Sequence, residues 1–128
     1  MTLHEAVALA LYGATRRRIL GAIVRTLCGR PIPDLDDLPP RLPEESLLAW
    51  ASRCDGAADP GSDAVTLARR ADRMLDEARS RGQSAVVLGQ PDSPPLLAEM
   101  PDPPPVLWLR GSSEMLRWPR MVALVGAR

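Results

Sequence analysis

The residues best suited to bind a ligand close the chain, where Gly126, Ala127 and Arg128 follow a run of small apolar residues, 122–125. Such a run is typical of a buried parallel strand, and the turn after a strand of this kind faces the ligand crevice of an α/β sheet. Gly126 permits a close approach of backbone to ligand, Ala127 offers its backbone N–H, and Arg128 carries a planar guanidinium suited to a phosphate. The pattern therefore predicts a phosphate-binding turn at 126–128.

Other residue types give no support to catalysis or metal binding. His4 is the single histidine and has no Ser, Cys or metal-site partner at recognisable spacing. Cys28 and Cys54 belong to no Cys/His cluster with metal-ligand spacing, which favours a reduced, cytoplasmic protein. No phosphate loop ending in Gly-Lys-Ser/Thr and no full Gly-x-Gly-x-x-Gly fingerprint is present. We therefore expect no catalytic residue, no metal, no cofactor and no enzyme activity.

Charge is balanced overall, with 16 basic and 16 acidic residues, so net charge predicts neither nucleic-acid nor membrane binding. No segment reaches the ~20 apolar residues that a membrane span needs. Consecutive arginines at 16–18 would spread over about 200° of a helix, which favours a solvated face. Arg69, Arg70 and Arg73 interleave with acids, which favours local ion pairs over a phosphate track. The acids concerned are Asp72, Asp76 and Glu77.

Apolar spacing predicts helices in the first two thirds of the chain. Residues from Leu3 to about Cys28 should form two helices or one interrupted helix, because Gly13 and Gly21 weaken a single one. A loop from Gly29 to Pro43 precedes a helix expected to start at 43–45. The helix at about 63–81 should begin at the N-cap Ser62 and end at Gly82. Its apolar stripe consists of Leu67, Ala71, Met74, Leu75 and Ala78.

Short apolar runs at 85–88, 106–109 and 121–125 predict three strands. Between them we expect a short turn around Leu96 and Leu97, an extended proline segment at 101–105 and a capped turn at 111–118. Trp50 and Trp108 lie in apolar surroundings, which favours packing over base stacking, whereas Trp118 is less apolar in context. The predicted fold is α/β: a helical region, 1–60, followed by the opening strands of an incomplete Rossmann-like parallel sheet, 61–128.

Several segments of the second half, in order, resemble the DNA-processing protein A family, also called DprA or Smf. These are Arg81-Gly82, Ala85-Val-Val-Leu88, Asp92-Ser-Pro-Pro-Leu-Leu97, the stretch from Pro101 to Gly111, and Val122-Ala-Leu-Val-Gly-Ala-Arg128. Three positions depart from the family pattern: Ser93 and Trp108 stand where tyrosine is usual, and Ala127 replaces the serine of Gly-Ser-Arg. The missing hydroxyl at 127 removes one possible phosphate hydrogen bond.

This resemblance implies a cytoplasmic protein that binds single-stranded DNA, protects incoming strands during transformation and helps load the RecA recombinase. It places the nucleic-acid contacts at Gly126, Ala127 and Arg128. The family's Rossmann-like domain continues beyond such a turn, so we expect this chain to be the N-terminal part of a longer protein. On its own it should bind single-stranded DNA weakly and be prone to self-association, because the strand at 121–125 would lack its neighbours.

Two other functions fit parts of the sequence. A Val-Gly-Ala-Arg turn also resembles the first turn of Rossmann-like proteins or enzymes that bind nucleotides, although those folds do not require the stretch from Gly82 to Gly111. A non-functional product of a truncated gene is the third possibility. The resemblance over 82–111 favours the DNA-binding interpretation.

Overall fold

The computed structural model of the chain describes residues 1–13, 17–30, 38–56 and 61–118. The first two helices confirm the predicted interruption near Gly13: α1 spans Leu3–Tyr12 and α2 spans Arg17–Leu27. The start of α1 is a capping box, in which Thr2 Oγ1 accepts from the Glu5 N–H at 3.2 Å and a Glu5 carboxylate oxygen accepts from the Thr2 N–H at 2.7 Å. Gly13 closes α1 and is buried against Leu20, which leaves no room for a side chain there.

The next two helices form where expected, but both begin at different residues. α3 spans Leu47–Cys54 with Ser46 as its N-cap, so the predicted start at 43–45 is wrong, because Glu45 is engaged with Arg53 instead. α4 spans Gly61–Ser80, so Ser62 lies inside the helix rather than at its N-cap. Its predicted stop at Gly82 is confirmed, with φ +65° and a hydrogen bond of 2.8 Å from the Gln83 N–H to the Ala78 carbonyl.

Two strands form an antiparallel pair, β1 at Ser84–Val87 and β2 at Val106–Leu109. The parallel arrangement expected for them is therefore wrong. The proline segment 101–105 returns the chain to the end of β1, so that Val106 lies opposite Val87 and the Leu88 N–H reaches the Pro105 carbonyl at 3.0 Å. A parallel pair would need a crossover to the other end of β1. The third predicted strand, 121–125, lies outside the described residues.

Short helical turns flank β2, as the sequence predicted. The 3₁₀ helix η2 spans Pro95–Glu99, and η3 spans Ser113–Arg117. Ser112 caps η3, because its hydroxyl accepts from the Glu114 N–H at 3.2 Å. Among the described residues, no helix is long and apolar enough to cross a membrane.

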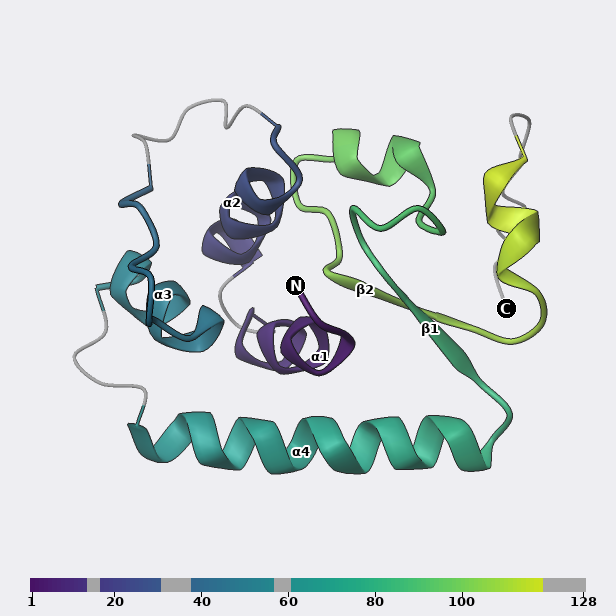
Figure 1. Ribbon diagram of the computed structural model, residues 1–128, viewed down its shortest axis with the longest axis horizontal. Helices are drawn as coiled ribbons and strands as arrows, with labels where there is room; N and C mark the ends of the chain where they lie inside the picture. The colour runs from purple at the N-terminus through teal and green to yellow at the C-terminus, as the bar shows by residue number, and fades with distance from the viewer. Residues whose placement is uncertain (14–16, 31–37, 57–60, 119–128) are drawn as a thin grey trace, which may run out of the picture.

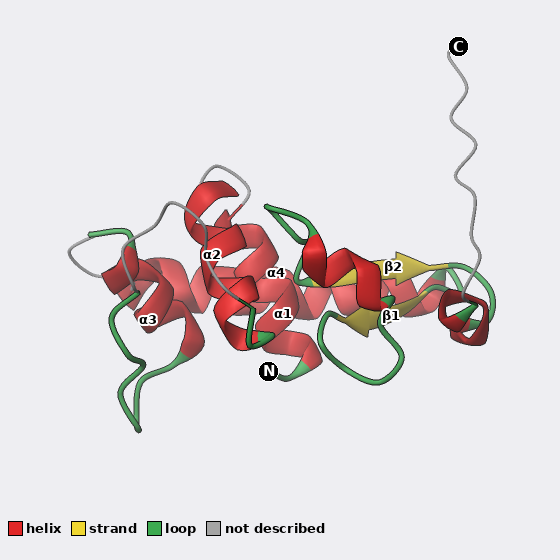
Figure 2. Ribbon diagram, turned by 90° about the horizontal axis from the view of Figure 1, so that it is seen from above, coloured by secondary structure: helices red, strands yellow, loops and turns green. Residues whose placement is uncertain are grey.

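The core has two parts, and α1 contributes to both of them. On one side α1 meets α2, α3 and the residue after β1; on the other side it meets α4 and the strand pair (Figures 1 and 2). The buried residues of the first part are Leu9, Tyr12, Ile23, Val24, Leu47, Trp50, Ala51 and Leu88. Those of the second part are Ala6, Val7, Ala8, Ala71, Val87 and Val106. The predicted division at residue 60 remains a prediction.

The apolar stripe of α4 is confirmed in part. Ala71 and Ala78 are buried, and Leu67 and Leu75 are half-buried. Met74 is 36% exposed, so its predicted burial is wrong. On a helix Met74 points about 60° away from Ala71, which places it at the edge of the packed face.

Candidate nucleic-acid interface

The three residues predicted to contact nucleic acid, Gly126, Ala127 and Arg128, lie outside the described residues. The structure describes the chain up to Trp118, whose side chain is 60% exposed just after η3. Packing is therefore not confirmed for Trp118. Trp50, in contrast, is buried and donates its indole N–H to the Pro39 carbonyl at 2.7 Å, while Trp108 is half-buried against the core. Packing is thus confirmed for Trp50 and in part for Trp108.

Several arginines are already neutralised by carboxylates. The N···O distance is 2.7 Å from Arg30 to Glu99, 2.8 Å from Arg53 to Glu45, 3.4 Å from Arg79 to Asp76 and 2.5 Å from Arg81 to Glu77. The buried Arg25 donates to the Met100 carbonyl at 2.8 Å. A phosphate that approached one of the four paired guanidiniums would also meet the paired carboxylate. These arginines are poor candidates for phosphate contacts.

Arg69, Arg70 and Arg73 on α4 differ from those arginines. All three are exposed, and no hydrogen bond or ion pair joins them to another residue in the described part of the chain. The ion pairs predicted for them are therefore wrong. Their expected partners are engaged elsewhere: Asp72 lies 3.2 Å from His4 Nε2, Asp76 pairs with Arg79, and Glu77 pairs with Arg81.

The sequence does contain the signal for this exchange of partners. Glu77 precedes Arg81 by four residues, and an acid four residues before a base is the favourable orientation on a helix. Pairing of Arg73 with Glu77 would have the reverse order. His4, in contrast, comes from another helix, so its contact with Asp72 could not be found from spacing along α4.

His4 joins α1 to α4. Its Nε2 lies 3.3 Å from the Ala68 carbonyl and 3.2 Å from the Asp72 carboxylate. A packing role for His4 is consistent with the absence of a catalytic pattern around it. Cys28 and Cys54 are unbonded and half-buried, and burial raises the pKa of both thiols. Within the described ranges, no group of three or more His, Cys, Asp or Glu residues could hold a metal ion.

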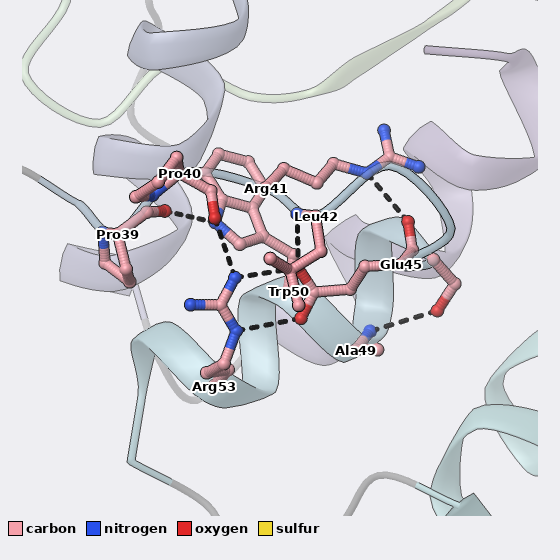
Figure 3. A network of polar contacts seen from close by, with 9 residues as sticks. Pro39, Pro40, Arg41, Leu42, Glu45, Ala49, Trp50 and Arg53 are labelled. Carbon is pink, nitrogen blue, oxygen red and sulfur yellow. Dashed lines mark hydrogen bonds and ion pairs between the residues drawn. The ribbon is translucent and has the colours of Figure 1, made fainter.

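A polar network holds the segment before α3 (Figure 3). Glu45 binds Arg53 through both carboxylate oxygens, at 2.9 Å to Nε and 2.8 Å to an Nη, and it accepts from the Leu42 N–H at 3.1 Å. Arg53 also donates to the Pro40 carbonyl at 2.8 Å. The hydrogen bonds from Arg53 lower the pKa of Glu45 from its usual 4.5 to about 2. Glu45 thus stays ionised and locally neutralised, and residues 39–42 are fixed against α3.

Of the 16-to-18 arginine run, Arg16 and the side chains of its two neighbours lie outside the described part of the structure. Its predicted role as a solvated face therefore stays a prediction. Ser93, which stands where the DprA pattern has tyrosine, has a structural task here, because its hydroxyl accepts from the Gly89 N–H at 3.1 Å. Trp108, at the other departing position, lies opposite Ala85 in the strand pair.

Comparison with protein families identifies the second part of the chain. Residues 84–128 match the family model of DNA recombination-mediator protein A. The resemblance to DNA-processing protein A is confirmed over this range, which contains β1, β2, η3 and the predicted turn at 126–128. No curated protein and no solved structure matches the chain. The recombination-mediator match indicates a role in DNA processing and recombination.

Proposed function

We propose that this chain is a DprA-like protein that binds single-stranded DNA, protects incoming strands and helps load RecA during transformation or recombination. The observation that carries the proposal is the match of residues 84–128 to the recombination-mediator family. The balanced total charge is compatible with this function, since binding depends on local phosphate contacts rather than on net charge. We expect no bond-making or bond-breaking step, no cofactor and a cytoplasmic location.

In this proposal Gly126 lets the backbone approach the strand, Ala127 contributes its backbone N–H, and Arg128 neutralises a phosphate with its guanidinium fork. One such contact gives a salt slope of only about −0.7 for a single strand, so this turn alone binds weakly. Among the described acids near α3, Glu45 is paired with Arg53 and therefore adds little repulsion.

Fluorescence anisotropy with a labelled oligothymidine tests the function. At about 0.01 M salt, where the Debye length is about 30 Å, we expect saturable binding. Absence of binding to the single strand at this salt concentration contradicts the proposal. Arg128→Ala should weaken binding, whereas Arg110→Ala, at an exposed position of the same family match, should not. Equal effects of both variants would remove Arg128 from the site.

RecA loading has a separate assay. Assembly of RecA on single-stranded DNA that is already covered by single-strand-binding protein should be faster when the chain is present. Nuclease digestion of the same DNA should be slower. If neither rate changes although the chain binds oligothymidine, the protein is a simple DNA binder and the mediator role is wrong.

A further inference from the structure

Three arginines near the middle of α4 have no ion-pair partner in the described part of the chain and form a basic surface, which we call the α4 arginine surface: Arg69, Arg70 and Arg73. With 3.6 residues per turn, the three side chains fall within an arc of about 100°. All are exposed, and none has a carboxylate partner in the described part of the chain. A compact group of free guanidiniums on one helix face is suited to an extended chain of phosphates.

The surrounding charges explain why this surface stays positive. Asp72 contacts His4 of α1 at 3.2 Å and is not paired with an arginine of α4, although 66% of its side chain is exposed. Asp76 and Glu77 lie one turn further along and are matched by Arg79 and Arg81. The C-terminal end of α4 is therefore locally neutral, whereas Arg69, Arg70 and Arg73 have no ion-pair partner in the described part of the chain.

The position of α4 leaves this surface open. α4 runs along one side of the molecule, with α1 on its inner side and no other described helix or strand on its outer side (Figure 1). Ala71 is fully buried and marks the inward face of α4. With 3.6 residues per turn, the three arginines point about 100° or more away from Ala71 around the helix axis. A long flexible ligand can thus reach all three guanidiniums without displacing another element.

We propose that the α4 arginine surface binds the phosphate backbone of single-stranded nucleic acid through Arg69, Arg70 and Arg73. This inference rests on the proposed function and adds a second contact region to the turn at 126–128. Contacts to phosphates position a strand but do not read its bases, so binding here is independent of sequence. Three contacts raise the expected number of neutralised phosphates from one to four.

The salt dependence of binding measures that number. Four contacts predict a slope of log K against log salt of about −2.8, compared with about −0.7 for Arg128 alone. Between 50 and 200 mM salt, the affinity should therefore fall about 50-fold with four contacts and about 3-fold with one. Binding is then weak near physiological salt and easily measured at low salt.

Two double variants, one within α4 and one at its C-terminal end, test the proposal, because each removes two positive charges. Arg69→Gln with Arg73→Gln removes free arginines, whereas Arg79→Gln with Arg81→Gln removes paired ones. Anisotropy with labelled oligothymidine should show a slope reduced by about 1.4 for the first variant and an unchanged slope for the second. Circular dichroism and thermal melting of the full chain confirm that both variants fold.

The outcomes separate this inference from the proposed function. If the unmodified chain does not bind oligothymidine at low salt, the proposed function itself fails. If it binds and the Arg69/Arg73 variant keeps the same slope, only the α4 arginine surface is wrong. Equal slope changes in both double variants overturn it too, because they show a nonlocal charge effect. A polyglutamate peptide serves as a probe for an acidic protein partner. If the Arg69/Arg73 variant loses binding to this peptide but keeps binding to oligothymidine, the surface binds an acidic protein and the proposal is overturned.

Discussion

The position of α1 between the two parts of the core gives a sharp test of the fold. Leu9 is fully buried and packs in the part of the core shared by α1, α2 and α3. We expect Leu9→Ala to destabilise the protein strongly. Alanine is the best helix former, so the loss cannot come from helix propensity.

The expected magnitude follows from burial. Leucine to alanine removes three carbon groups, worth about 0.8 kcal/mol each when buried, or about 2.4 kcal/mol in all. The cavity left behind adds to this loss, because neighbours on several elements cannot all close in, and measured values for such changes run from about 2.7 to 5.0 kcal/mol. We therefore expect a loss of about 3–5 kcal/mol in the free energy of unfolding.

Urea denaturation followed by circular dichroism measures this loss. Leu96→Ala is the matched control, since Leu96 is 74% exposed on η2, and it should change stability by less than about 0.5 kcal/mol. A loss below about 0.5 kcal/mol for Leu9→Ala would mean that α1 is not packed on both sides. The arrangement of α4 relative to the rest would then lose its support, because α1 is the helix on which α4 packs.

Three further predictions concern single residues. The pKa of Glu45 is lowered from 4.5 to about 2, so its contribution to stability is complete above about pH 4.5 and is lost as the pH falls towards 2. In Glu45→Gln, the free energy of unfolding should therefore fall less steeply with decreasing pH than in the unmodified protein. Parallel curves of unfolding free energy against pH would contradict this. Gly21→Ala should lower the melting temperature although alanine is the better helix former, because the new Cβ would lie 2.9 Å from the Pro101 carbonyl oxygen. Overpacking of this kind typically costs about 1–3 kcal/mol. A higher melting temperature would show that the segment at Pro101 does not pack this closely on α2. Gly82→Ala should cost about 1–2 kcal/mol in urea denaturation, since φ there is +65°, and an unchanged midpoint would place the end of α4 elsewhere.

Features set by local chemistry could be predicted from the sequence. The break at Gly13, the stop at Gly82, the residues of β2 and the cap of η3 all follow from glycine, apolar runs and a serine before a turn. The starts of α3 and α4 could not, because several residues compete to cap each helix. At α3 the decision depends on Arg53, eight residues away from Glu45, whose bidentate contact removes that acid from the helix start.

Strand direction is a nonlocal property, which is why it was predicted wrongly. The apolar runs at β1 and β2 suit either direction, and family resemblance favoured the parallel one. The connection between β1 and β2 decides their relative direction, because the proline segment 101–105 places Val106 opposite Val87 at the end of β1. The predicted site at 126–128 lies within the family match but outside the described residues, so its role as a binding turn remains a proposal.

The availability of Arg69 for a phosphate depends on α1 as well as on α4. Asp72 follows Arg69 by three residues, which is a spacing that permits an ion pair on a helix. In the folded protein the Asp72 carboxylate instead lies 3.2 Å from the imidazole of His4, which belongs to α1. The free arginines of α4 are thus a consequence of tertiary packing. Asp72, whose spacing would permit an ion pair with Arg69, contacts His4 of α1 instead. A basic surface of this kind cannot be found by counting charges along the sequence, because the partner of each acid is decided only when the helices pack together.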